Sequence, residues 1–347
     1  MNSPCAAAVL LWMAVSSMLG LGAQPATPQF AEATAASDPV FRVSVPLVLL
    51  DAVVAQQRTG QPVGGLTAAD FVLQEDGEPQ AITYFAQDEL PLSIVFMFDL
   101  TFTVQPVLRT LGSAAQEILS HLKPQDEVAV AVFSSTSTIL QPFTTDREAA
   151  AAAIRQASGM TSGEATFLNE SVYQVARETL KSSASNNRRA IICLTDGTVN
   201  TPSESMRKRW GKSVPEGQIH TEEEARRALL EAGASFNAIV ERSTLSYLSV
   251  AAQHLDPAGS DNKRYPPGHV KDYAELAGGI VLNSSKKETV TKLGSLLSDL
   301  GSRYTLGYRP TRDLPAGAFC RIHLELTREA SARSGHPVVR TRSGYYR

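Results

Sequence analysis

The stretch LSIVFMFDLTFT, residues 92–103, decides the fold class. Its first seven residues are almost entirely apolar, which is typical of a strand that is buried on both faces of a sheet. Apolar residues at helical spacing follow over 104–122, and DEVAVAVFS, residues 126–134, is a second apolar strand. This order predicts two parallel strands joined by a right-handed helical crossover.

The same alternation of strands and amphipathic helices continues along the chain. We therefore predict an α/β domain over 90–309, with a doubly wound, mainly parallel, Rossmann-like sheet flanked by helices. The further predicted helices cover 146–156, 169–180, 221–231, 270–277 and 288–302. The further predicted strands are RRAIICLTD (188–196), SFNAIV (235–240), GIVL (279–282) and YTLGY (304–308).

Both flanks of this domain are β-like. Residues 40–89 contain the alternating run FRVSVPL, the run LVLLDAVV, and a hairpin signal at Asp76-Gly77. Residues 310–347 contain the alternating run AFCRIHLEL and a further strand candidate, VVRTRSGYY. The N-terminal flank has too little apolar content to fold securely alone. We predict that the two flanks form one small β-sandwich-like unit, into which the α/β domain is inserted.

The first residues of the chain are typical of a targeting segment. An uncharged apolar run covers Ala6 to Ala23, and a polar stretch rich in Ala and Pro follows. We predict a signal peptide over 1–23, a flexible spacer over 24–39, and an exported protein that is periplasmic, on the cell surface or secreted. An uncleaved N-terminal membrane anchor is the alternative, because no Lys or Arg precedes the run.

Charge and cysteine content exclude some functions. The formal net charge of -3 gives no general attraction to nucleic acid, and after signal removal only Cys193 and Cys320 remain, too few for a disulfide framework. From Arg303 to the C-terminus, however, the chain has nine arginines and three acidic residues. These arginines either occupy outward-facing strand positions or form a basic ligand-binding face.

Asp99 ends the apolar strand of residues 92–99 and is followed by Thr101 and Thr103. In open parallel sheets ligands bind beyond the carboxyl ends of the strands, where Asp196 also lies. An acid in this position can hold a metal ion or attack a phosphate, so the spacing alone leaves both functions open. Thr166 lies before a predicted helix, where it either contributes to the same site or caps the helix.

The motif DLTFT (99–103) resembles the D-x-S-x-S metal-ion-dependent adhesion site of von Willebrand factor type A domains. SGEATFLNESV (162–172) resembles the loop that supplies the threonine of that site, and CLTDG (193–197) resembles the segment with its second acid. The flanking segments resemble the VWFA-related domain of exported acidobacterial proteins, and together the resemblance covers 40–347. It implies a metal site made of Asp99, Thr101, Thr103, Thr166 and Asp196.

This resemblance implies a non-enzymatic, exported module that binds proteins through Mg²⁺, or through Mn²⁺ or Ca²⁺. Hydroxyl oxygens bind a hard cation directly, while the two acids act largely through hydrogen bonds and water. An open coordination position then accepts a carboxylate of the protein partner. The resemblance implies neither nucleic acid nor a small-molecule substrate, and the sequence does not indicate the oligomeric state.

Two alternatives stay open. Haloacid-dehalogenase-like phosphatases carry a D-x-D-x-T motif, in which Asp99 would be the nucleophile with Mg²⁺. Thr101 stands where that chemistry needs a second acid, and threonine titrates too high to replace it. The other alternative is a purely structural domain that has lost its metal. The polar loop from Thr198 to His220 directly follows Asp196 and is our candidate for a specificity surface.

Overall fold

The computed structural model describes residues 47–58, 60–87, 90–162, 166–182, 187–197, 220–241 and 270–347. The predicted signal peptide and spacer lie outside these residues. So does most of the predicted specificity loop. No helix within the described ranges is long and apolar enough to cross a membrane.

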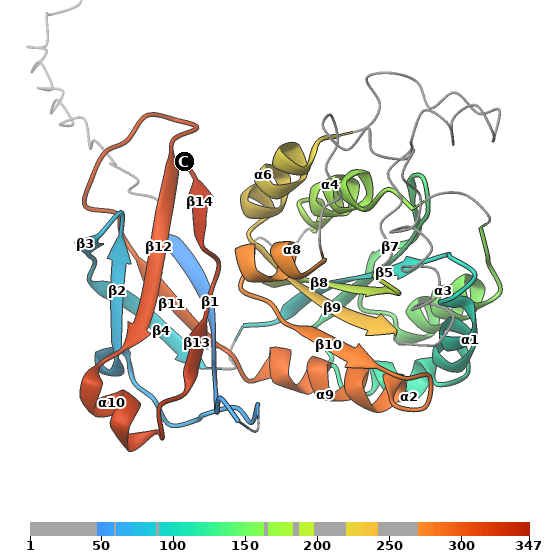
Figure 1. Cartoon of the computed structure of the whole chain (residues 1–347), viewed down its shortest axis with the longest axis horizontal. Helices are drawn as coiled ribbons and strands as arrows, with labels where there is room; N and C mark the ends of the chain where they lie inside the picture. Colours follow the sequence, from blue (N-terminus) through green and yellow to red (C-terminus); the bar gives the residue numbers. More distant parts are fainter. Residues whose placement is uncertain are drawn as a thin grey trace, which may run out of the picture. The chain divides into compact units, whose positions relative to one another are not determined.

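A six-stranded sheet forms the centre of the described α/β region, with the strand order β10-β9-β8-β5-β6-β7 (Figure 1). Neighbouring strands are parallel except at one edge, where β7 is antiparallel to β6. The prediction of a mainly parallel sheet is therefore confirmed. The strands are β5 (Leu92–Asp99), β6 (Glu127–Phe133), β7 (Ser137–Thr144), β8 (Arg188–Thr195), β9 (Ala234–Glu241) and β10 (Val281–Ser284).

Helices cover both faces of this sheet (Figure 1). One face carries α1 (Gln105–Ser113), α2 (Ala115–Leu119), α3 (Arg147–Ser158) and α9 (Thr289–Gly301). The other carries α4 (Leu168–Thr179), α6 (Glu222–Ala232) and α8 (Val270–Leu276). The single helix predicted over 104–122 is two helices, because the backbone of Ala114 leaves helical geometry at φ -102° and ψ 13°.

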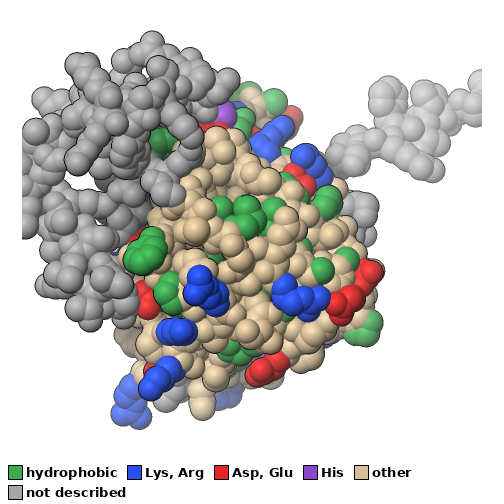
Figure 2. All heavy atoms as spheres, turned by 90° about the vertical axis from the view of Figure 1, so that its right-hand side faces the viewer, with side chains coloured by type: hydrophobic (Ala, Val, Ile, Leu, Met, Phe, Trp, Pro, Cys, Tyr) green, Lys and Arg blue, Asp and Glu red, His purple; other side chains and the backbone are tan. Residues whose placement is uncertain are grey.

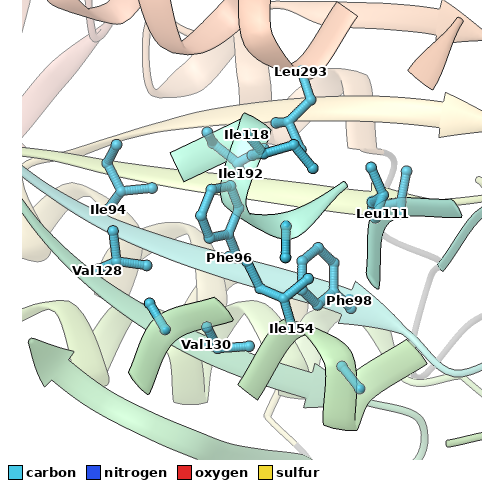
Figure 3. Packing of buried hydrophobic residues seen from close by; sticks show 14 of the residues in the cluster. Ile94, Phe96, Phe98, Leu111, Ile118, Val128, Val130, Ile154, Ile192 and Leu293 are labelled. Atoms are coloured by element: carbon cyan, nitrogen blue, oxygen red, sulfur yellow. The ribbon is translucent and has the colours of Figure 1, made fainter. Parts of the chain in front are cut away.

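The packing of strand β5 explains why its sequence is almost entirely apolar. Ile94, Phe96 and Phe98 pack into the cluster beneath α1, α2, α3 and α9, as Figure 3 shows. Val95 and Met97 belong to the cluster beneath α4, α6 and α8. Because alternate side chains of a strand point to opposite faces, a strand covered on both sides needs apolar residues at every position.

Two four-stranded antiparallel sheets form from the flanks of the chain. The first has the order β13-β1-β11-β4 and the second the order β14-β12-β2-β3. The first comprises β1 (Val48–Ala55), β4 (Ile82–Gln87), β11 (Tyr304–Tyr308) and β13 (Val338–Arg340). The second comprises β2 (Phe71–Glu75), β3 (Glu78–Pro79), β12 (Phe319–Leu326) and β14 (Gly344–Tyr346). Strands from both ends of the chain therefore share each sheet, and the boundaries 40–89, 90–309 and 310–347 stay predictions.

The segment YTLGY (304–308) does not belong to the parallel sheet, so its prediction as a strand of that sheet is wrong. As β11 it pairs antiparallel with β1 and β4 and adds nothing to the parallel sheet. The physical reason is its core contact, since Tyr304, Leu306 and Tyr308 are buried together with Leu50 in the sandwich cluster. VVRTRSGYY is also two short strands, β13 and β14, in different sheets, and the short helix α10 (Arg328–Arg333) was not predicted.

A buried carboxylate connects the two antiparallel sheets. Glu75 on β2 is fully buried, and its Oε2 accepts hydrogen bonds from the hydroxyls of Tyr308 on β11 and Tyr345 on β14. The Tyr345 bond is 2.9 Å long. Burial raises the pKa of both tyrosines, so they stay neutral donors. Cys320 lies in the same core and, like Cys193, is a free buried thiol.

Candidate metal centre

Asp99 and Asp196 lie at the carboxyl ends of adjacent strands. Asp99 is the last residue of β5, Asp196 directly follows β8, and the parallel register pairs Phe98 with Leu194. The two acids therefore lie at the same end of the sheet, where the parallel strands have their carboxyl ends, as the sequence predicted. The strand arrows of β9 and β10 point toward this end in Figure 1, and Figure 2 looks onto it.

The carboxylate of Asp99 is completely buried and held by two donors. The backbone N–H of Thr101 donates to Oδ1 at 2.9 Å, and the hydroxyl of Thr195 donates to Oδ2 at 2.7 Å. The largest contributions of the described residues to the pKa of Asp99 come from burial, Asp196, Thr195 and Thr101. The carboxylate is thus oriented by two neutral hydrogen-bond donors.

Thr101 and Thr103 bring hydroxyl oxygens to the same place. The hydroxyl of Thr103 donates a short hydrogen bond to Oδ2 of Asp196 and lies 3.3 Å from the hydroxyl oxygen of Thr101. The turn is fixed because the N–H groups of Val104 and Gln105 both donate to the carbonyl of Thr101, at 3.1 and 3.2 Å. Four of the five predicted residues are therefore linked by direct contacts.

The electrostatics of this end of the sheet are unfavourable for two negative charges. Burial, and next the charge of Asp196, raise the pKa of Asp99 to about 7, while the Thr195 and Thr101 hydrogen bonds oppose the rise. Two carboxylates in one site destabilise each other's charged forms unless a cation or a proton lies between them. Uptake of a proton or a cation would relieve this repulsion at Asp99.

Thr166, the fifth predicted residue, has a buried hydroxyl without a hydrogen-bond partner among the described residues. It lies in a loop attached to the same strand ends, because Ser162 N–H donates to the Leu100 carbonyl at 2.8 Å and Phe167 N–H donates to the Ser134 carbonyl at 2.9 Å. No hydrogen bond joins the hydroxyl of Thr166 to the other four residues. Its interpretation as a helix cap is wrong, since Phe167 is the N-cap residue of α4 and no side chain caps it.

Sequence reasoning missed two residues at this end of the sheet. Thr195 orients Asp99, and Glu241, only 4% exposed, ends β9 next to β8, where Thr195 pairs with Val240. Glu241 had the same signal as Asp99, an acid that ends an apolar strand. Even with it, the described residues contain no group of three or more His, Cys, Asp or Glu side chains suited to a metal, so a cation here would depend on hydroxyl oxygens.

An exposed aromatic side chain lies in the middle of the DLTFT motif. Phe102 is 73% exposed, whereas Leu100 and Val104, two residues before and after it, are buried. In the part of this face that Figure 2 shows uncovered by grey atoms, hydrophobic side chains are scattered among charges of both signs. Phe102 is the most exposed of the large hydrophobic residues within the described ranges.

The fold and the arrangement of these residues define an open α/β domain with its candidate site at the carboxyl ends of parallel strands. Residues 94–198 match the model of the von Willebrand factor type A domain, so the chain contains a domain of this family. This match includes all five predicted site residues. The narrower resemblance to the acidobacterial domain stays a prediction, and no curated protein matches the chain.

Several solved structures are similar to parts of the chain. BatB from Bacteroides thetaiotaomicron is 14% identical, with a TM-score of 0.39 over 60% of this chain and 98% of that chain. A von Willebrand factor type A structure from Catenulispora acidiphila is 10% identical, with a TM-score of 0.43 over 76% and 71%. The vWF domain of the type V pili tip protein Mfa5 from Porphyromonas gingivalis is 10% identical, with a TM-score of 0.41 over 65% and 98%. The family assignment rests on the sequence match.

Proposed function

We propose that the domain is a metal-dependent protein-binding module. Its cation is Mg²⁺, or Mn²⁺ or Ca²⁺, held by Asp99, Thr101, Thr103, Thr166 and Asp196. The observation that carries this proposal is the contact of Thr103 with Asp196 across two chain segments, beside a buried Asp99 that has no cationic partner among the described residues.

The chemistry of the donor set fits a hard divalent cation. Mg²⁺ prefers oxygen ligands and keeps several waters, so a few carboxylates and hydroxyls are sufficient to bind it. The partnerless hydroxyl of Thr166 supports this fit, because an unsatisfied buried polar group costs about 1–3 kcal/mol unless a ligand satisfies it. When bound, the cation supplies a positive charge to which a carboxylate of the partner can bind.

Phe102 gives the proposed partner a second kind of contact. Its ring is available to a partner beside the two threonines, and aromatic residues are enriched among the side chains that dominate binding energies. A partner segment with an acidic residue next to an apolar one fits both features. The predicted signal peptide over 1–23 supports an extracytoplasmic place for this binding.

A phosphatase is the weaker alternative. Asp99 would have to act as the nucleophile, but it is fully buried and its raised pKa of about 7 leaves a large protonated fraction at neutral pH. Thr101 also offers no proton for the leaving group. A purely structural domain is the third possibility, and it predicts no metal binding.

Isothermal titration calorimetry of chelator-treated protein tests the proposal. We expect saturable binding of Mg²⁺ or Mn²⁺, lost in the double variant Asp99→Ala, Thr101→Ala. The matched control is Thr110→Ala with Glu117→Ala, which removes a threonine and an exposed acid from α1 and α2 on the same domain. No binding by any of the three cations, or unchanged binding in the site variant, would refute the proposal. Release of phosphate from p-nitrophenyl phosphate that Asp99→Asn abolishes would establish the enzyme instead.

A further inference from the structure

A cavity of about 340 Å³ lies between helix α8 with its following turn and strands β12 and β13. Its volume is at the lower end of the range for small-molecule sites. It is separate from the candidate metal centre and contains none of the five predicted site residues. Its polar lining includes Glu275, His323, Arg340, Thr341, Arg342 and Ser343.

The charges that line this cavity are not balanced. Neither Arg340 nor Arg342 has a carboxylate within ion-pair distance in the described part of the chain. Glu275 is the acid of the lining, and it pairs outward with Lys271 at 3.5 Å. These arginines belong to the basic C-terminal segment that the sequence left with two interpretations, an outward strand face or a ligand-binding face.

Arg342 is held in place but is not neutralised. Its Nη2 donates to the Leu49 carbonyl at 2.8 Å, and its guanidinium carbon lies 5.5 Å from the ring centroid of Tyr345. Its Nε is buried and has no hydrogen-bond partner in the part of the chain that the structure describes. Burial lowers the pKa of Arg342, although Tyr308 and Asp51 act in the opposite direction. A bound anion would offset this cost of burying a charge.

The walls of the cavity are fixed to each other. Ser343 N–H donates to the Leu276 carbonyl at 2.8 Å, and a β-bridge joins Ala277 to Arg342. Gly278, at φ +71°, approaches so closely that an added Cβ would lie 2.4 Å from the carbonyl carbon of Thr341. A cavity with walls in such contact is preformed, so a ligand would not have to order them.

We propose that this cavity binds a small organic anion. A carboxylate or phosphate group pairs with Arg340 and Arg342, since the planar guanidinium presents paired N–H donors that match two oxygens of either oxyanion. The apolar body of the ligand packs on the remaining lining, which includes Ile322, Leu324 and Val339. This binding does not depend on the metal centre.

Calorimetric titration of the full chain with benzoate and with phenyl phosphate, at constant ionic strength, tests this inference. We expect saturable binding of at least one probe and none of the neutral probe benzamide. The probe that binds more tightly shows whether the cavity prefers a carboxylate or a phosphate. Arg340→Gln should weaken binding about tenfold or more, and this change is compatible with folding because Arg340 is exposed. Arg342→Gln should abolish binding, with circular dichroism reporting its fold.

Arg321→Gln is the matched control, because Arg321 is an exposed arginine on β12 outside the cavity lining. It should leave probe affinity within about twofold. Failure of both probes to bind, equal binding of benzamide, or equal loss in the Arg321 and Arg340 variants would overturn the inference. None of these outcomes bears on Mg²⁺ titration, so the two proposals are tested separately.

Discussion

The hydroxyl of Thr195 on β8 donates a 2.7 Å hydrogen bond to Oδ2 of Asp99 on the neighbouring strand β5. The same hydroxyl accepts the N–H of Gly197 at 3.1 Å, so one side chain fixes both the first acid and the turn after the second. Orientation of a ligand by groups behind it is common in metal sites. The geometry of Asp99 therefore depends on a residue outside the five predicted site residues.

Thr195→Val should weaken the proposed metal binding without removing a ligand. Loss of the donor raises the pKa of Asp99 further above about 7, because the Thr195 hydrogen bond lowers it. At neutral pH, Mg²⁺ affinity should fall about tenfold, as a hydrogen bond to a charged group contributes about 1.5–3 kcal/mol. Calorimetry measures this change, and Thr195→Ser, which keeps the hydroxyl, should restore affinity to within about twofold.

Thr166→Val should raise the stability of the metal-free protein and lower its affinity for the metal. Valine replaces a buried hydroxyl that has no partner with a methyl group of similar size, so the metal-free protein should become more stable by about 1 kcal/mol. Mg²⁺ affinity should fall in the same variant, because the proposed ligand oxygen is lost. Urea unfolding with chelator and calorimetry measure the two effects. A metal-free variant less stable than the unchanged protein would contradict this account of Thr166.

The metal-free protein should lose stability as the pH rises. The pKa of Asp99 is raised from 3.8 to about 7, so the folded state holds a proton that the unfolded state releases. Its contribution is fully present below about pH 4 and is lost as the pH approaches about 7. The slope is at most about 1.4 kcal/mol per pH unit. Urea unfolding at several pH values in chelator measures it, and Asp99→Asn should flatten the profile between these limits.

Tyr345→Phe should destabilise the antiparallel unit. The change removes a 2.9 Å hydrogen bond to the fully buried Glu75, which connects the two sheets. We expect a loss of about 1.5–3 kcal/mol, since the acceptor is ionisable and shielded from water. Tyr346→Phe, in the adjacent position, is the control and should change stability by less than about 0.5 kcal/mol. Equal losses of stability in both variants would show that the hydrogen bond between Tyr345 and Glu75 does not stabilise this unit.

Local pattern predicted the central sheet because β5 is buried on both faces, which requires the continuous apolar run that its sequence shows. The same reasoning failed for YTLGY. A short apolar run does not reveal its partner, and the pairing of β11 with β1 joins residues more than two hundred positions apart. Strand assignment at that distance depends on tertiary packing.

The candidate site, too, could be predicted only in part from the sequence. Asp99 and Asp196 could be predicted because the carboxyl ends of parallel strands meet at one end of the sheet. The capping alternative for Thr166 could be excluded only from the structure, since Phe167 occupies the N-cap position of α4. Thr195 had no signal of its own, because a threonine beside an acid is common, and its role depends on the register of β5 with β8.

The position of β11 also determines how the α/β region can be produced as a fragment. It lies between β1 and β4, so both of its edges are hydrogen-bonded, and only Ser302 and Arg303 separate it from α9. A recombinant fragment ending at residue 309 would display a strand with two unpaired edges, a template for aggregation. Ending the fragment at Ser302 avoids that strand, and it is the better starting point for expression trials of the α/β region.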